Sequence, residues 1–501
     1  MRTFEILLIL ANLFSLGLGF KKQIRAVWLG IAGANIFLLL IHGIFEGFRY
    51  QMDFSYIFVL LLAVYTFLKT NYRFEPQTPK ALKMIGICLS FVCLAFTALL
   101  AYALPVFALP KLTGNYPVGV QYFHLIDENR TDPFLDPSMQ PRELMLKVYY
   151  PAEPDEAKPF ASYFHSPALI KLFTAFYGLP DFLFDHLHLV ATHEKENLQL
   201  ADRERSYPVV LFSHGAGTSM EVQTSQSEDL ASHGYIVVAI DHTYVSAATV
   251  FPDRIVSAKE ATRNFNVAEP AEVITQIMAD DASFVMDTME EMNEGKIESI
   301  FKGKLDLARI GAIGHSVGGA VAYNLAINDH RVKAAINLDG RVYITPKGDP
   351  KIVVPFLMLA SDAFIQTIRD RTSLMKQFAE MTDEEQKITL SMYGSAAAYQ
   401  EAYSKDIQNM IGLTEVLKAS GNLFTIEGSA HMKFTDIGLF IGLPQVREIM
   451  GIGGKTGPVK CLEITKAVTV AFFDRYLKGE PKDSLESLLT KYPELKRVYL
   501  E

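Results

Sequence analysis

Four apolar stretches lie within the first 110 residues, and they restrict the fold of this part of the chain more than any other feature does. Each is near or above the length that a helix needs to cross a hydrocarbon core of about 30 Å. Inside a bilayer only helices and closed barrels satisfy their own backbone hydrogen-bonding groups, so such runs indicate helices. The stretches are Phe4–Phe20, Ala26–Phe45, Phe54–Leu68 and Met84–Leu109. We therefore predict a transmembrane region of about four spans over residues 1–110.

The basic residues of the short connecting loops predict the orientation of these spans. Loops rich in lysine and arginine stay in the cytoplasm. The loops after the first and third stretches hold Lys21, Lys22, Arg25, Lys69, Arg73, Lys80 and Lys83, whereas Arg2, Arg49 and Lys111 flank the other side. We therefore expect a multi-pass membrane protein in which everything after Leu109 lies on the non-cytoplasmic side.

Two of the stretches allow a different interpretation. The first has the length of a signal peptide, but only Arg2 precedes it, no small-residue cleavage site follows it, and three more apolar stretches come after it. The third is the shortest of the four, so a re-entrant or interfacial segment is the alternative there.

Residues 111–501 show a different pattern, in which short apolar runs alternate with helical stretches. Runs such as VVLF at Val209–Phe212 are continuously apolar, as expected for a strand whose two faces are both covered. The pattern predicts an α/β catalytic domain with a mostly parallel sheet flanked by helices, and a helical insertion at about 363–420. The candidate strands are Leu144–Tyr150, Val209–Phe212, Ile236–Ile240, Ile310–Ile313, Ala334–Leu338, Val354–Leu359 and Leu423–Ile426.

The segment RIGAIGHSVGGA, at Arg309–Ala320, contains a G-x-S-x-G motif between a predicted strand and a predicted helix. In that context the serine sits on a tight turn, and the glycines at 314 and 318 leave room for neighbouring backbone. The motif predicts an α/β-hydrolase fold with Ser316 as the nucleophile.

A serine hydroxyl needs a base and an orienting carboxylate, which follow the serine in the order acid, then histidine. His431, in EGSAHMKF after the last candidate strand, is the predicted base. Two carboxylates compete for the third position, because Asp339 and Asp362 each end a predicted strand. The strand pattern alone leaves this choice open.

Two backbone N–H groups are expected to stabilise the negative oxygen that forms during the reaction. Val317 follows the nucleophile and supplies the first. The second is predicted in the loop SHGAG after the strand VVLF, with Ala216 as the donor and Gly215 as the alternative.

Composition excludes several other classes of function. The net charge is -9, and no stripe of lysine and arginine with interleaved aromatic residues is present, so a nucleic-acid partner is not expected. The three cysteines have no metal-ligand spacing, and we expect neither a metal nor a cofactor.

Four segments give residues 111–440 a resemblance to the plasma-type platelet-activating-factor acetylhydrolases, also called lipoprotein-associated phospholipases A2. They are TGNYPVGV with KVYYP (Thr113–Pro151), VVLFSHGAG with LASHGYIVVAIDH (Val209–His242), GHSVGGA with NLDG (Gly314–Gly340) and EGSAHMKFTD (Glu427–Asp436). In that family the acid lies 23 residues past the serine, which is the spacing from Ser316 to Asp339. The resemblance therefore favours Asp339 over Asp362.

The resemblance also implies an activity. It indicates a calcium-independent serine esterase that removes short or oxidised acyl groups from the sn-2 position of phospholipids. The apolar stretches, in which this sequence departs from the secreted members of that family, indicate the lipid bilayer as a further partner. The alternatives are a general lipase, an esterase or polyester hydrolase, or an acyltransferase of the same fold. An inactive membrane interaction protein is a further alternative, disfavoured by the complete set of site residues.

Overall fold

The computed structural model describes residues 1–18, 24–72, 79–135, 140–261, 271–344, 354–370, 377–481 and 483–500. The chain forms two compact units. The helical unit contains Met1–Ala108, Leu179–Val190 and Leu439–Arg447. The sheet unit contains Leu109–Gly178, Ala191–Gly438 and Glu448–Glu501.

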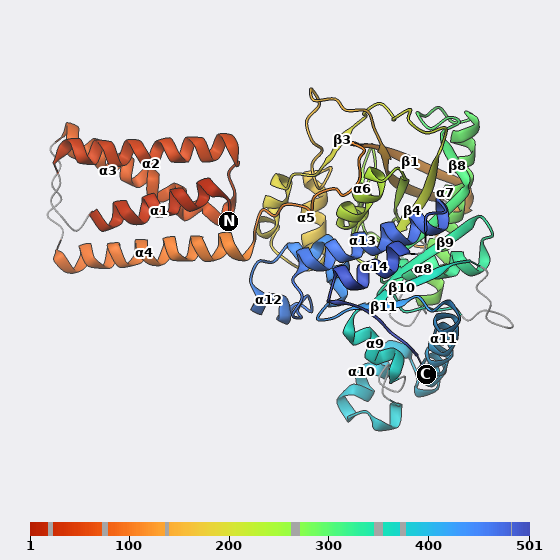
Figure 1. Ribbon diagram of the computed structural model, residues 1–501. Helices are drawn as coiled ribbons and strands as arrows, with labels where there is room; N and C mark the ends of the chain where they lie inside the picture. The colour runs from red at the N-terminus through yellow and green to blue at the C-terminus, as the bar shows by residue number, and fades with distance from the viewer. Residues whose placement is uncertain are drawn as a thin grey trace. The chain divides into compact units, whose positions relative to one another are not determined.

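Four apolar helices form the body of the helical unit (Figure 1). They are α1 (Thr3–Leu18), α2 (Arg25–Phe45), α3 (Asp53–Asn71) and α4 (Lys80–Ala103). Among the residues that the structure describes, three helical segments are long and apolar enough to cross a membrane, namely Arg25–Phe45, Tyr50–Asn71 and Lys80–Ala103. Helix α1 is apolar but has only 16 residues. The predicted first span ends at Phe20, so its last two residues lie outside the described residues, as do Lys21, Lys22 and Arg73.

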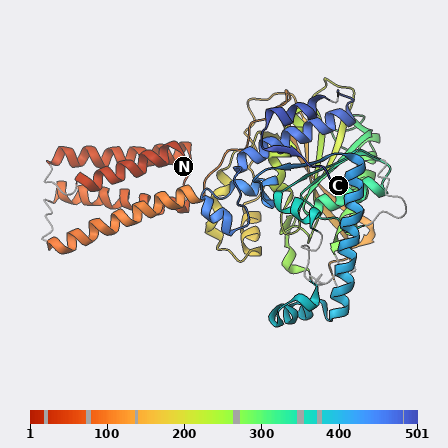
Figure 2. The ribbon, with the colours of Figure 1, turned by 60° about the horizontal axis from the view of Figure 1, so that its bottom comes forward.

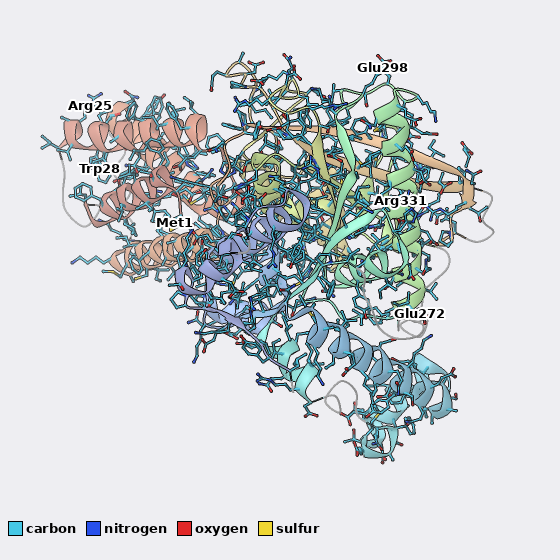
Figure 3. All side chains as sticks on the ribbon, turned by 45° about the vertical axis from the view of Figure 1, so that its right-hand side comes forward. Met1, Arg25, Trp28, Glu272, Glu298 and Arg331 are labelled. Atoms are coloured by element: carbon cyan, nitrogen blue, oxygen red, sulfur yellow. The ribbon has the colours of Figure 1, made fainter. Side chains whose placement is uncertain are left out.

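A buried arginine joins one end of this bundle. Arg49, in the connection between α2 and α3, donates to Glu5 Oε2 at 2.8 Å and to the carbonyl oxygens of Ala101 and Leu104 at 3.1 and 2.5 Å. The start of α1, the α2–α3 connection and the end of α4 therefore lie together, so the helices alternate in direction. Figure 3 shows Met1 and Arg25 toward opposite ends of the bundle, as this arrangement requires.

Polar side chains also hold α1 against its neighbours along its length. Asn12 Nδ2 donates to Ser55 Oγ at 2.6 Å, and Asn35 Nδ2 donates to Ser15 Oγ at 2.8 Å. All four side chains are buried. Hydrogen bonds between buried polar side chains are a usual means of joining helices that lack a hydrophobic driving force in lipid.

Two segments from much later in the sequence belong to the helical unit. One contains η2 (Asp181–Leu183) and η3 (Asp185–Leu189), and Gln51 Nε2 donates to its Leu183 carbonyl at 3.0 Å. The other leads into α12 (Pro444–Ile449), and the Gly442 N–H donates to the carbonyl of Ala103 at 2.8 Å. Both segments therefore contact residues at the ends of the apolar helices.

The sheet unit is built on a ten-stranded mixed sheet with the order β12-β11-β10-β9-β8-β4-β5-β2-β1-β3. The six strands from β5 to β11 in this order are parallel to one another. Each of the seven predicted strands overlaps an observed one, whereas β1, β3 and β12 were not predicted. The strands are β1 (Val118–Thr131), β2 (Pro141–Pro151), β3 (Glu194–Glu196), β4 (Tyr207–Ser213), β5 (Ile236–Asp241), β8 (Leu305–His315), β9 (Val332–Leu338), β10 (Phe356–Ala360), β11 (Leu423–Ile426) and β12 (Leu495–Arg497), and β6 (Ala248–Val250) pairs separately with β7 (Ile255–Ser257).

Helices cover both faces of this sheet, and each face has its own hydrophobic core. Apolar side chains of α7, α8, α9 and α11 contribute to one core, and those of α6, α13 and α14 to the other. Figure 3 labels Glu272 and Glu298 near the two ends of α7, with Arg331 beside the helix. The helices are α6 (Thr224–Ser232), α7 (Ala271–Glu294), α8 (Val317–Asn328), α9 (Asp362–Arg369), α11 (Ala396–Ser420), α13 (Pro458–Leu477) and α14 (Asp483–Lys491).

Helices occupy the insertion expected at about 363–420, of which residues 371–376 lie outside the described part. Helix α11 packs Met410, Leu413 and Leu417 into the core, whereas α10 (Asp383–Tyr393) exposes Ile388 and Leu390. Figure 2 shows α10 at the end of α11 that lies away from the sheet.

Candidate active site

Ser316 occupies the turn between β8 and α8, where the G-x-S-x-G motif predicts it. Its φ of 57° and ψ of -124° are unusual for a residue with a side chain. Backbone packs against both motif glycines. A Cβ at Gly314 would lie 2.1 Å from the Gly318 carbonyl oxygen, and one at Gly318 would lie 2.1 Å from that of Ser213. The glycines therefore allow the tight turn that presents Ser316.

His431 and Asp339 form a direct pair. Asp339 follows β9, and its Oδ2 lies 2.7 Å from His431 Nδ1 at the start of η8 (His431–Phe434). Its other oxygen, Oδ1, accepts the Ser361 N–H at 2.6 Å. An ionised carboxylate can only accept, so this contact places the proton of a neutral His431 on Nδ1 and leaves Nε2 unprotonated.

Asp362, the alternative acid, has different partners. It is the first residue of α9, and its Oδ2 accepts the Gly428 N–H at 2.7 Å. Its Oδ1 accepts the hydroxyl of Thr425 at 3.3 Å. The structure therefore brings Asp339, and not Asp362, to His431.

Ser316 lies close to the residue after Asp339, and its neighbour His315 contacts the backbone of His431. A Cβ at Gly340, the residue after Asp339, would lie 2.1 Å from the Ser316 carbonyl oxygen. Ser316 and His431 make no hydrogen bond to each other among the described residues. In hydrolases without substrate this bond is often long and forms fully in the complex.

His315 is a site residue whose place the sequence did not predict. Its Nε2 lies 2.9 Å from the His431 carbonyl oxygen, and the two ring centroids are 4.5 Å apart. Burial, assisted by the neighbouring His431, holds the pKa of His315 well below its usual range. Its ring is therefore neutral, and Nε2 donates to the carbonyl. Its position beside the motif serine gave no local signal for these contacts.

The two predicted oxyanion donors lie on either side of Ser316. Val317 is the first residue of α8, and Ala216 lies in the loop after β4. A Cβ at Gly215 would be 3.1 Å from Ser316 Cβ, so this loop approaches the nucleophile closely. In the described part of the chain, the N–H groups of Ala216 and Val317 have no hydrogen-bond partner. Both are thus available to a substrate oxygen.

Among the residues that the structure describes, no group of three histidine, cysteine, aspartate or glutamate side chains is arranged to hold a metal ion.

A family model described as "Platelet-activating factor acetylhydrolase, isoform II" matches residues 103–488, well over half of the chain. The chain belongs to this family. The resemblance seen in the four sequence segments is thereby confirmed.

Curated relatives agree with this assignment. The chain is 24% identical over 358 residues to "Platelet-activating factor acetylhydrolase" of Cavia porcellus, which covers 66% of this chain and 72% of that protein. It is 27% identical over 322 residues to the protein of that name from Bos taurus, with 56% and 66% covered. It is also 24% identical over 305 residues to "Probable 1-alkyl-2-acetylglycerophosphocholine esterase" of Arthroderma benhamiae, with 59% and 66% covered.

A solved structure supports the fold. A ferulic acid esterase from Streptomyces cinnamoneus matches with a TM-score of 0.56 and 26% identity, covering 78% of this chain and 99% of that one. The predicted α/β-hydrolase fold and the prediction of a serine esterase are confirmed by these matches.

Asp436 ties the segment after His431 to the beginning of α6. Its carboxylate accepts the Ser225 N–H at 3.1 Å, the Ser225 hydroxyl, and the Tyr163 hydroxyl at 3.3 Å. Complete burial raises the pKa of Asp436 to about 7, against the opposing effect of these hydrogen bonds.

This raised pKa predicts a pH-dependent stability. An unfolded aspartate has a pKa of 3.8, so between that value and about 7 the folded protein keeps a proton that the unfolded chain releases. The free energy of unfolding therefore falls as the pH rises through this window. Above the folded pKa, the whole contribution of the Asp436 proton has been lost. The Asp436→Asn variant does not titrate, so we expect its melting temperature relative to wild type to rise between roughly pH 5 and pH 8. The exposed Asp253→Asn variant is the control, and a constant difference for Asp436→Asn would contradict the prediction.

Proposed function

We propose that this chain hydrolyses a carboxylic ester through an acyl-enzyme formed on Ser316. The observation that carries this proposal is the 2.7 Å contact between His431 and Asp339, beside a serine on a strained turn. His431 Nε2 removes the Ser316 proton as Oγ attacks the ester carbonyl carbon. The N–H groups of Ala216 and Val317 stabilise the resulting oxyanion. The proton then passes to the leaving alcohol.

The second half of the reaction uses the same groups. Water gives a proton to His431 as its oxygen attacks the acyl carbon. His431 then returns that proton to Ser316 Oγ while the bond between Oγ and the acyl carbon breaks and the acid leaves. Asp339 holds the imidazole in the tautomer with the proton on Nδ1 and stabilises the imidazolium that forms in each half.

The substrate that we propose is a phospholipid with an acetyl or other short acyl group at the sn-2 position, hydrolysed without calcium. The names of the relatives support this proposal, since they describe acetylhydrolases of platelet-activating factor and an esterase of 1-alkyl-2-acetylglycerophosphocholine. The ferulic acid esterase favours a second candidate, a simple ester that is not a phospholipid.

We also propose that the helical unit crosses the membrane four times, with the N-terminus and the catalytic domain of residues 111–501 on the non-cytoplasmic side. Three helical segments have spanning length, and the polar contacts of α1 support it as the fourth. The alternating helix directions and the basic loops at the other end support the orientation.

Loss of Ser316 tests the proposed reaction directly. In full-length protein in detergent, we expect Ser316→Ala to lower turnover of a 2-acetyl phospholipid by about 10⁴-fold or more, because the attacking oxygen is lost. The melting temperature serves as the control for folding. Retention of wild-type turnover by a folded variant would refute the proposal. A wild type that hydrolyses p-nitrophenyl acetate but neither 2-acetyl nor long-chain phospholipid supports the second candidate.

The two carboxylates give a matched pair of variants. Asp339→Asn changes the tautomer that the pair stabilises, and we expect kcat to fall by about 10²–10⁴-fold. Asp362→Asn keeps an oxygen that can accept the Gly428 N–H, and we expect kcat to stay within about threefold of wild type. Steady-state kinetics on one substrate compares them. The reverse order of effects would assign the acid role to Asp362.

Cysteine labelling tests the membrane orientation. In a chain with Cys88, Cys93 and Cys461 replaced by serine, we expect an impermeant maleimide to label Phe48→Cys in intact cells. Ile24→Cys lies at the other end of the bundle and should react only after lysis. The cysteine-free chain gives the background, and labelling of Ile24→Cys alone in intact cells would show the opposite orientation.

A further inference from the structure

The peptide group between Gly215 and Ala216 is held unusually firmly. The Gly215 carbonyl oxygen has three donors around it: Thr218 Oγ1 at 2.6 Å, His214 Nδ1 at 2.8 Å and the Thr218 N–H at 3.1 Å. The C=O and N–H groups of a trans peptide lie in one plane and point in opposite directions. Fixing the Gly215 carbonyl therefore fixes the direction of the Ala216 N–H.

The contacts of His214 determine which of its nitrogens carries the proton. Its Nε2 lies 3.1 Å from the backbone nitrogen of His242, which can only donate, so Nε2 is the acceptor. The proton of the neutral ring is then on Nδ1, where it is donated to Gly215. Asp241 Oδ1 lies 3.6 Å from Nε2, beyond hydrogen-bond distance.

The backbone N–H of His242 sets this tautomer, and the side chain of His242 is held by buried partners. Its Nδ1 lies 3.0 Å from Asp281 Oδ2, and its Nε2 lies 3.1 Å from Ser213 Oγ. Arg142 Nη2 donates to the same Asp281 oxygen at 2.8 Å. All of these side chains are buried, so water does not compete for their contacts. Arg142 and Asp281 thus hold the side chain of His242, whose backbone N–H donates to His214.

We propose that His214 is a positioning residue of the oxyanion hole, acting through the Gly215–Ala216 peptide. This inference rests on the proposed function, in which the Ala216 N–H stabilises the oxyanion. The hydrogen bond from Nδ1 keeps that N–H directed at the position where negative charge develops. It also withdraws electron density from the carbonyl and strengthens the N–H as a donor. Thr218 assists through its hydroxyl.

A buried histidine that only supports the fold would behave differently from a positioning residue. Loss of a fold contact lowers the amount of folded enzyme and leaves the kinetics of the folded molecules unchanged. Loss of oxyanion positioning weakens an interaction made in the transition state, so kcat falls while KM stays nearly constant. The two roles are therefore separable by kinetics.

The test compares His214→Leu, His214→Asn and Thr218→Val in the full-length protein in detergent. Leucine removes the donor, whereas Asn Nδ2 takes the place of His Nδ1 and keeps it. Valine keeps the shape of Thr218 and its backbone N–H but removes the hydroxyl. We expect kcat on a 2-acetyl phospholipid to fall by about 10–100-fold for His214→Leu and about 3–10-fold for Thr218→Val. His214→Asn should recover to within about fivefold of wild type, with KM changed by less than about threefold throughout.

An alkyl trifluoromethyl ketone provides the second measurement, because its adduct with a serine hydroxyl carries an oxyanion. We expect the inhibition constant to rise across the variants in proportion to the loss of kcat/KM. Equal losses in His214→Leu and His214→Asn, or an inhibition constant that does not follow kcat/KM, would overturn the inference. If His214→Leu does not fold, His214→Asn and Thr218→Val decide by the second criterion, whether the inhibition constant follows kcat/KM.

A fluorophosphonate probe on the wild-type protein separates this inference from the proposed function. Absence of label on Ser316 would refute the proposed function and the inference together. Labelled Ser316 with kinetics that are indifferent to His214 would overturn the inference alone.

Discussion

Close contact between backbone segments around Ser316 is the constraint on which the rest of the site depends. A Cβ added at Gly314, Gly318 or Gly340 would lie only 2.1 Å from a backbone carbonyl oxygen. Strands β4, β8 and β9 and the start of α8 converge at these contacts. No side chain separates these segments. Ser316, the loop that contains Ala216, and Asp339 after β9 are therefore brought close together.

Much of this arrangement follows from local sequence. Runs such as VVLF predict central strands because both faces of the strand are buried, and the motif around Ser316 predicts the turn. Strand β1 escaped prediction because its second half contains the charged residues Asp127, Glu128 and Arg130 and has no continuous apolar run. Short edge strands such as β3 and β12 have three residues each, too few to give a pattern. Their position depends on pairing with strands that are distant in the sequence.

The site residues also divide into those that local sequence predicts and those whose roles depend on contacts far away in the sequence. Two carboxylates end strands, and nothing local distinguishes Asp339 from Asp362. The choice depends on which of them the loop of His431 reaches, and family resemblance supplied that information before the structure placed Asp339 2.7 Å from the imidazole. The roles of His214 and His315 depend on contacts with His242 and His431, which lie far away in sequence. A histidine beside a serine or a glycine carries no local signal for such contacts.

The two units cannot be separated by a single cut in the chain. The polypeptide passes from one unit to the other five times, after residues 108, 178, 190, 438 and 447. A chain cut near residue 110 would keep Leu179–Val190 and Leu439–Arg447 but lose Gln51 and Ala103, which they contact. Phe184, Leu187 and Phe440, all buried in the intact protein, would lose part of their cover. The helical unit is therefore completed by segments encoded far downstream, and no single peptide bond separates it from the sheet unit.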